Sequence, residues 1–390
     1  MQTVDWIVVG NGIAGAALSY ELVKQQQSVL LIDAASSDSG TRYSYGGIAY
    51  WSGTDETTKA LCQAGIERHR QLSDELGAET EFRELDLLLT IAPEHDLEQT
   101  AQQYAHYAIP PQLISAAEAC DREPQLNRDA IAGAMLVKHG HVHPVKTVEA
   151  YNQAFRRLGG QHIVASVSGL VRVGEQVTGV ITPTQAYAAR QVAIAAGAYS
   201  RPLLAALGLQ VPLYYTHAEI IETPPVELTL QSLIMPANSQ RFELEAKVSQ
   251  PEKAALWQTP NQVLAAPILD AGAIQFLDGS IRIGQISRVH TTLDPSLPAA
   301  ESEAALRAAI AAQLPALAAV PGSWRHCRVT FSRDGLPLIG PVPGIEGLQL
   351  FSGFTSPFAM LMPVAERFAR WAVGAADPLI ETMLAARFFD

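Results

Sequence analysis

A turn with three glycines, set between two apolar runs, constrains the fold of this chain more than any other feature. Residues 4–34 read VDWIVVGNGIAGAALSYELVKQQQSVLLIDA. The apolar runs are typical of buried parallel strands, and the segment between the turn and the second run has helix-forming composition. The glycines have the spacing Gly-x-Gly-x-x-Gly: Gly10, Gly12 and Gly15. The order strand, turn, helix, strand and acid, with Asp33 as the acid, predicts a dinucleotide-binding βαβ unit.

Each part of this unit has a physical task. Gly10 permits the tight turn, Gly12 lets a pyrophosphate approach the backbone, and Gly15 lets helix and strand pack closely. The helix N-terminus offers free N–H groups and the positive end of its dipole to that pyrophosphate. Asp33 can accept hydrogen bonds from both hydroxyls of an adenosine ribose. The alternative is a structural glycine turn in another kind of α/β protein.

Length and charge limit the remaining classes. At 390 residues the chain is too long for one simple core, so we expect two domains. A formal net charge of −12 and a sequence pI of about 5.3 argue against a nucleic-acid partner and against electrostatic binding to anionic membranes. We also expect no membrane span and no signal peptide, because no apolar run is long enough and no basic segment begins the chain.

The cysteines and histidines do not form a recognisable ligand pattern. Three cysteines, at positions 62, 120 and 327, are too scattered for a disulfide framework or a zinc site, and they favour a cytoplasmic location. Residues 138–144 read KHGHVHP and hold three histidines. These would share a face only in an extended segment, whereas Gly140 and Pro144 indicate a turn. We therefore expect no metal site.

Two glycine-containing loops are candidates for ligand binding. Residues 34–53, AASSDSGTRYSYGGIAYWSG, are too rich in Gly and Ser for a regular element. Arg42 could meet a pyrophosphate charge, and Ser44, Gly46 and Gly47 would let the backbone lie close to a flat ring; the alternative is a flexible surface loop. Near the C-terminus a strand, the turn 353–358 and a helix create a second N-terminal site for an anion or a carbonyl group.

The hydrophobic pattern changes character along the chain. Four segments are predicted to be long helices: residues 56–76, 144–158, 299–313 and 360–373. The spacing of Ser115 and Glu118 predicts a capping box that starts a shorter helix. From residue 212 onward, short alternating segments predict a mostly antiparallel sheet that would cover a ligand held by the first domain: residues 217–222, 240–244, 262–267, 274–277 and 280–287.

Taken together, the motifs give the chain a family resemblance. It resembles the D-amino-acid-oxidase-like FAD-dependent oxidoreductases, which include the glycine oxidase and sarcosine oxidase relatives. The pieces that match, in the family's order, are Gly10–Gly15 with Asp33, the Ser44–Gly47 loop, His141–Pro144, Val167, Ala195–Ser200, Gly208–Pro212, Ser280–Gly284, Asp334–Pro337 and Gly353–Phe354.

This resemblance implies a two-domain α/β (α+β) fold with a Rossmann-like FAD-binding domain and a smaller substrate domain with a mostly antiparallel sheet. The FAD-binding domain would comprise residues 1–80, 140–212 and 322–390, and the substrate-binding domain residues 81–139 and 213–321. The implied FAD-binding residues are Gly10, Gly12, Ile13, Ala14, Gly15, Asp33, Ala34, Arg42, Ser44, Gly46, Gly47, Val167, Ala196, Gly197, Cys327, Asp334, Gly335, Gly353, Phe354, Thr355, Ser356 and Pro357.

Two residues match special positions of the sarcosine oxidase branch. Cys327 lies seven residues before Asp334, where that branch links a cysteine covalently to the flavin; the alternative is a small buried residue. Arg282 matches a lysine that assists oxygen reduction in that branch, and a fixed positive charge there would act electrostatically. The alternative for Arg282 is an outward-facing strand residue.

The chain also departs from the family pattern. Where glycine and D-amino acid oxidases carry an arginine for the substrate carboxylate, this sequence has Val329, with Arg328 beside it. Neighbours on a strand face opposite sides, so Arg328 substitutes only at a bulge. A lysine after the Gly-Phe turn is absent as well. The remaining candidates for a carboxylate or polar lining are Arg241, Arg282, Arg288, Tyr214, Tyr215 and His217. As catalytic candidates we take Arg282, Arg328 and Tyr215.

The resemblance predicts an enzyme that oxidises the C–N bond of a small amine or amino acid by hydride transfer to flavin N5, giving an imine that hydrolyses. Three alternatives remain: a dehydrogenase that passes electrons to a quinone or carrier, a 2-hydroxy-acid oxidase of the same fold, and a non-catalytic flavin-binding subunit. The partners would be the substrate and oxygen or a redox carrier. The departures leave open an unusual amino acid or an amine without an α-carboxylate, and the oligomeric state stays open.

Overall fold

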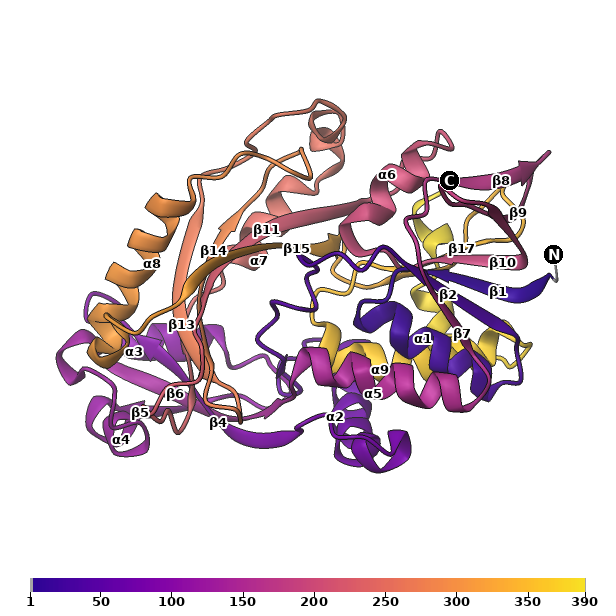
Figure 1. The fold of residues 1–390 in the computed structure, drawn as a ribbon. Helices are drawn as coiled ribbons and strands as arrows, with labels where there is room; N and C mark the ends of the chain where they lie inside the picture. Colours follow the sequence, from indigo (N-terminus) through magenta and orange to yellow (C-terminus); the bar gives the residue numbers. More distant parts are fainter. Residues whose placement is uncertain (1–2, 390) are drawn as a thin grey trace.

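Two sheets organise the chain, as the computed structural model of residues 3–389 shows (Figure 1). The first has eight strands with the order β16-β17-β10-β1-β2-β7, and β8 and β9 extend it beyond β10. Parallel pairs join β17, β10, β1, β2 and β7. Its strands are β1 (Val4–Val9), β2 (Val29–Asp33), β7 (Gln161–Val164), β8 (Gly169–Val173), β9 (Gln176–Ile181), β10 (Ala186–Ile194), β16 (Leu338–Pro341) and β17 (Leu348–Ser352).

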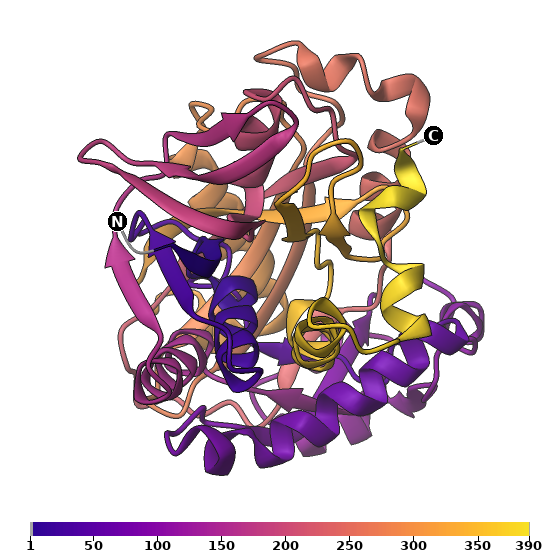
Figure 2. The ribbon, with the colours of Figure 1, turned by 90° about the vertical axis from the view of Figure 1, so that its right-hand side faces the viewer.

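Both faces of this sheet are buried, which explains its continuous apolar runs. Trp6 and Val8 of β1 face a layer of helices, whereas Ile7 and Val9 face a second core on the other side. The helices of this layer pack against one another, and Figure 2 shows them below the sheet. They are α1 (Ile13–Lys24), α2 (Glu56–Leu76), α5 (Pro144–Arg157) and α9 (Pro357–Ala372). The predicted βαβ unit and three of the four long predicted helices are confirmed here.

The second sheet has nine strands, and its pairs are antiparallel except for β4 with β12. The predicted antiparallel character is therefore confirmed. Leu306 and Ile310 of α8 (Ala299–Gln313), the fourth long predicted helix, pack on this sheet in one apolar cluster. The strands are β3 (Gly47–Ile48), β4 (Arg83–Ile91), β5 (Gln112–Ser115), β6 (Gly133–His141), β11 (Leu213–Glu222), β12 (Leu233–Pro236), β13 (Ile268–Gln275), β14 (Ile281–Arg288) and β15 (Ser323–Ser332).

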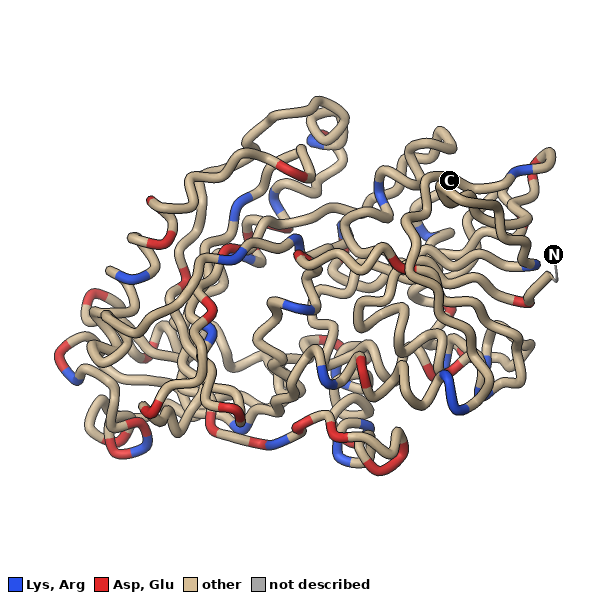
Figure 3. The backbone as a smooth tube through the Cα atoms, in the orientation of Figure 1, with Lys and Arg blue, Asp and Glu red and all other residues tan. Residues whose placement is uncertain are grey.

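Shorter helices lie around the sheets: α3 (Leu97–Gln103), α4 (Ala116–Arg122), α6 (Ser200–Ala205), α7 (Gln240–Val248) and α10 (Pro378–Thr382). The capping box predicted at the start of α4 is confirmed, because Ser115 Oγ accepts from the backbone N–H of Glu118 and the Glu118 carboxylate accepts from that of Ser115. Among residues 3–389, no helix has the length and apolar character needed to cross a bilayer. Figure 3 shows acidic and basic residues interspersed along the chain.

Three local predictions are wrong. Residues 240–244 form the start of helix α7, because Leu244 and Val248, four apart, bury one helical face while Phe242 stays exposed. Residues 262–267 are a loop with one isolated bridge, from Val263 to His290, instead of a strand. Residues 138–141 end strand β6, so Gly140 lies in a strand and not in a turn. There a Cβ atom would meet the side chains of Ile48 and Ile66, which explains the glycine.

Candidate functional site

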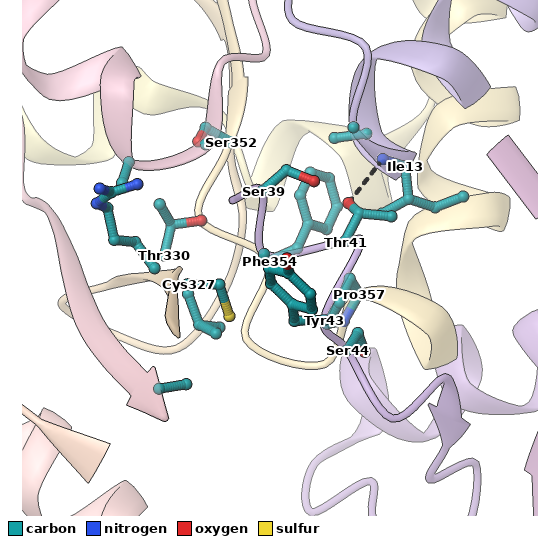
Figure 4. Close-up of a pocket in the computed structure, with 18 of the residues that line it drawn as sticks. Ile13, Ser39, Thr41, Tyr43, Ser44, Cys327, Thr330, Ser352, Phe354 and Pro357 are labelled. Atoms are coloured by element: carbon teal, nitrogen blue, oxygen red, sulfur yellow. Dashed lines mark hydrogen bonds between the residues drawn. The ribbon is translucent and has the colours of Figure 1, made fainter. Parts of the chain in front are cut away.

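A cavity of about 870 Å³ lies between the first βαβ unit and the second sheet. Its walls come from the β1–α1 turn, the loop 34–49, the ends of β7 and β10, the strands β11–β15 and the turn before α9. Figure 4 shows Ile13 and Thr41 on one side of this space and Cys327 and Thr330 on the other. The carboxyl ends of β1 and β2 open into it, which is where open α/β sheets bind ligands.

The glycine turn has the geometry that the sequence predicts. Gly10 has a φ of +104°, and a Cβ atom there would lie 2.6 Å from the carbonyl oxygen of Ala195. A Cβ atom on Gly15 would overlap the carbonyl oxygen of Gly10, so helix and strand pack as closely as expected. Gly12 instead borders the cavity, and its nearest neighbour would be Thr41 Oγ1 at 3.1 Å. Gly12 thus forms a wall that a ligand can approach closely.

Asp33 lines the same end of the cavity. Its Oδ2 accepts from the backbone N–H of Asn11 at 2.8 Å, and its Oδ1 accepts from that of Ala35 at 2.6 Å. Each oxygen keeps a second lone pair for a ribose hydroxyl. Ala34 and Val167 lie beside it in the lining. This end therefore suits the adenosine part of a dinucleotide.

The loop 34–53 contributes some of its predicted residues and not others. Ser44 and Gly47 line the cavity, whereas Arg42 lies outside the lining, with its guanidinium carbon 5.9 Å from the ring centre of Tyr43. Gly46 also lies outside, and a Cβ atom there would overlap the carbonyl oxygen of Val142. The need for Gly46 is therefore explained by backbone packing.

The turn before α9 lies wholly in the lining, from Gly353 to Pro357. The Thr355 Oγ1 atom of this turn and the Ser352 Oγ atom at the end of β17 are buried and have no hydrogen-bond partner among residues 3–389. Buried polar atoms are normally satisfied, so unpaired hydroxyls facing a cavity indicate a ligand with polar groups. Ala196 and Gly197, after β10, complete this wall.

The three predicted FAD-binding residues Cys327, Asp334 and Gly335 lie in different surroundings. Cys327 lines the cavity from β15, and burial raises the pKa of its thiol to about 12. Asp334 is outside the lining, where it pairs with Arg387 at 2.7 Å. Gly335 takes a φ of +77° in the turn that follows, with open space around it. Asp334 and Gly335 thus shape a turn in this structure.

Of the catalytic candidates, Arg282 and Tyr215 lie outside the cavity lining. Arg282 is buried, donates from Nη1 to the carbonyl oxygen of Ser44, and pairs through Nη2 with Glu222 at 3.2 Å. Arg282 thereby supports the loop at Ser44 without lining the cavity. Tyr215 donates its hydroxyl hydrogen to the carbonyl oxygen of Thr291 at 2.7 Å. The catalytic roles of both residues stay predictions.

The third candidate, Arg328, reaches the edge of the cavity but is held by ion pairs. Its Nη1 lies 2.6 Å from Asp38 Oδ2, and its Nη2 pairs with Asp294. Its Nε donates to the carbonyl oxygen of Leu293 at 2.6 Å. The guanidinium therefore ties the loop after β2 to the segment after β14, which leaves it little capacity for a substrate carboxylate.

Sequence reasoning missed several residues of the lining. Tyr45 donates its hydroxyl hydrogen to the carbonyl oxygen of Gly284, and burial raises its pKa. His139 accepts at Nδ1 from the indole of Trp51 at 3.1 Å, and burial lowers its pKa to about 3. Asp270, on β13, lines the cavity as well. The alternation of His139 with His141 is the signal for His139 in the sequence, but Gly140 and Pro144 favour a turn there.

Within the described part of the chain, no group of three or more His, Cys, Asp or Glu side chains could hold a metal ion. The three histidines of residues 138–144 are His139, His141 and His143, and burial lowers the pKa of each. Burial is the largest cause in each case, and the charges of Glu81 and Arg282 also act on His143.

Comparisons with known proteins agree with the geometry. Residues 5–371 match the family model described as FAD dependent oxidoreductase. The chain is 27% identical over 399 residues to glycine oxidase of Pseudomonas aeruginosa, with 96% of each chain covered. Its fold is similar to that of glycine oxidase from Geobacillus kaustophilus, with a TM-score of 0.75, 21% identity and coverage of 98% and 95%. It is also similar to that of L-proline dehydrogenase from P. horikoshii, with a TM-score of 0.77, 19% identity and coverage of 99% and 98%.

Proposed function

Since the chain belongs to the FAD dependent oxidoreductase family, we propose that it oxidises the C–N bond of a small amine or amino acid, giving an imine that hydrolyses. The observation that carries this proposal is one continuous cavity, with the glycine turn of the βαβ unit at one end and the space covered by the second sheet at the other. FAD supplies the two-electron acceptor, flavin N5, for the hydride that leaves the substrate carbon.

The chain's own residues would hold FAD along this cavity. Asp33 and Val167 would receive the adenosine, and the backbone from Gly12 to Ala14 would receive the pyrophosphate. Ser44 and Gly47 on one side and the turn Gly353–Pro357 on the other would enclose the flavin ring. The unpaired hydroxyls of Ser352 and Thr355 support that placement.

Protein residues would position the substrate and exclude water. The floor of the covered space is the second sheet, where Ala218, Ile220, Leu233 and Met235 line the cavity. These apolar side chains would keep water from the reacting carbon, and hydride transfer would need no additional acid–base pair.

We further propose that FAD is held without a covalent bond, because the Cys327 thiol is buried in its neutral form.

The proposed division into two domains follows the two sheets for most strands. We propose residues 1–80, 140–212 and 322–390 as the FAD-binding domain and residues 81–139 and 213–321 as the substrate-binding domain. Most strands respect these limits, but β15 begins just after residue 322 and pairs with β11 in the second sheet. β15 and the short β3 (Gly47–Ile48) would thus belong to the FAD-binding domain in sequence and to the substrate side in structure.

Turnover with isolated compounds tests this function. The purified FAD-loaded protein is incubated with small amino acids, N-methyl amino acids, simple amines and 2-hydroxy acids, and ammonia or amine release is measured. We expect release from an amino-group substrate, with peroxide formed if oxygen is the acceptor and dye reduction alone if a carrier is. Oxidation of 2-hydroxy acids alone would contradict the proposal.

We propose a cytoplasmic location, which the free, scattered cysteines support.

A further inference from the structure

Of the three histidines in residues 138–144, His139 alone lines the cavity. It lies near the end of β6, and its side chain is 5% exposed. The ring of His141 instead contacts that of Phe276, and His143 Nδ1 accepts from the backbone N–H of Lys146 at the start of α5; both lie outside the lining. His139 is therefore the histidine of this group that can meet a bound ligand.

One hydrogen bond fixes the position of the proton on the His139 ring. His139 Nδ1 accepts from the indole Nε1–H of Trp51 at 3.1 Å. An indole nitrogen can only donate, so Nδ1 carries no proton and the proton of the neutral ring is on Nε2. Burial lowers the pKa of His139 to about 3, so the ring is neutral near pH 7. His139 thus presents an N–H donor without a charge.

Aromatic packing holds the Trp51 indole in place. Its ring is stacked on that of Tyr104, with centres 6.5 Å apart, and it meets Tyr107 edge to face at 5.2 Å. Trp51 and Tyr104 are both buried. The direction of the His139 ring is thus set by the chain itself. A donor that is oriented before a ligand arrives costs little reorganisation when the ligand binds.

The Nε2–H of His139 has no acceptor among residues 3–389. The Nε2 atom of His141 is likewise unpaired but sealed, whereas that of His139 is accessible from the cavity. A Cβ atom on Gly47 would lie 2.7 Å from His139 Nε2, so this nitrogen lies against the backbone of Gly47, which lines the cavity too. Buried N–H groups normally have acceptors, so this one indicates a ligand atom with a lone pair beside Gly47.

We propose that the Nε2–H of His139 donates a hydrogen bond to an acceptor atom of the flavin ring. This inference rests on the proposed function, in which Gly47 borders that ring. The carbonyl oxygens and ring nitrogens of a flavin gain negative charge on reduction, so a donor held against them favours the reduced form. Trp51 acts through His139, because its indole keeps the proton on Nε2.

The two-electron midpoint potential of the FAD-loaded protein, measured against a reference dye without substrate, tests this hydrogen bond. His139→Phe keeps a ring but removes the N–H, so the equilibrium should shift about tenfold toward oxidised flavin, which lowers the potential by about 30 mV. His139→Gln keeps a side-chain N–H and should recover part of this shift. Trp51→Phe should lower the potential by less, because the ring can then place its proton on either nitrogen.

The matched control is Trp6→Phe, the same substitution at another buried tryptophan, which lies outside this cavity. A shift in His139→Phe no larger than that in Trp6→Phe would overturn the inference. FAD content and the unfolding temperature of each variant show that the fold is retained. If His139→Phe fails to load FAD, the same comparison with Trp6→Phe is made for Trp51→Phe.

¹⁵N NMR of the holoenzyme with labelled histidine observes the ring directly. The His139 signals, identified by their loss in His139→Gln, should show a protonated Nε2 and an unprotonated Nδ1. In Trp51→Phe the two shifts should approach each other as both tautomers form. A protonated Nδ1 in the wild type would refute the donor assigned here.

The substrate is the other molecule that could accept this hydrogen bond. An unchanged potential together with weaker binding of methylamine in His139→Phe would assign the N–H to the substrate and overturn the flavin contact. The proposed function fails separately, if no amino-group compound reduces the wild-type flavin, because the potential is measured without substrate.

Discussion

Alanine substitution at two glycines of the same turn should have different effects, one on stability and the other on FAD affinity. A Cβ atom on Gly15 would overlap the backbone of Gly10, which no side-chain rotation relieves. Overpacking costs about 3 kcal/mol at its usual upper end, and alanine returns about 1 kcal/mol through helix propensity. Gly15→Ala should therefore lose about 2 kcal/mol of stability, or roughly 2–3 °C in unfolding temperature for a chain of 390 residues.

Gly12→Ala should leave stability nearly unchanged, because its Cβ atom would approach only Thr41 Oγ1, at 3.1 Å. The methyl group would instead occupy the wall that the pyrophosphate approaches, so FAD affinity should fall at least about tenfold, which corresponds to about 1.4 kcal/mol.

The assay measures unfolding temperature and FAD affinity for both variants, with and without excess FAD, since ligand binding itself raises stability. If Gly12→Ala bound FAD as the wild type does, the cradle assigned to this turn would be wrong. If Gly15→Ala were as stable as Gly12→Ala, the packing argument would fail.

Three further predictions follow from buried groups. Acid precipitation should release all flavin into the supernatant, because the Cys327 thiol, with a pKa of about 12, stays neutral; yellow colour retained in the pellet would show a covalent bond. Burial raises the pKa of Asp38, but hydrogen bonds from Ser36 and Arg328 hold it below 3.8. The difference in stability between the wild type and Asp38→Asn, measured by urea titration, should therefore be present above pH 3.8 and lost as the pH falls below it. A difference that persists to lower pH would contradict this. Burial lowers the pKa of His69 to about 4, so the unfolded chain binds this proton first, and His69 should lower stability by up to about 3 kcal/mol between pH 6.5 and 4. His69→Gln should reduce the fall in stability over this range by that amount, while the other buried histidines keep the rest; an unchanged fall would refute the assignment.

Much of the fold was predictable from local sequence patterns. The βαβ unit was predictable because Gly10, Gly12, Gly15 and Asp33 act within one short segment, where spacing reports geometry directly. Helix α8 and the capping box of α4 were predictable for the same reason. The resemblance then ordered the weaker motifs into an FAD-binding chain, which the family match confirms.

The substrate side was less predictable, because it depends on contacts between distant residues. Nothing near Arg328 in the sequence indicates that its guanidinium is held by Asp38, 290 residues away. Helix α7 was mistaken for a strand, because Phe242 and Leu244 alternate although only Leu244 is buried. Asp270 reaches the cavity through a bulge, and a register shift leaves no pattern in one strand alone.

Anaerobic mixing of the FAD-loaded enzyme with small amino acids tests the central claim most directly. The account predicts that one amino acid bleaches the visible band of the oxidised flavin in a single turnover. One carbonyl product and one ammonia or amine should form per flavin reduced. If dithionite bleaches the flavin but no amino acid or amine does so, C–N oxidation by this protein is contradicted.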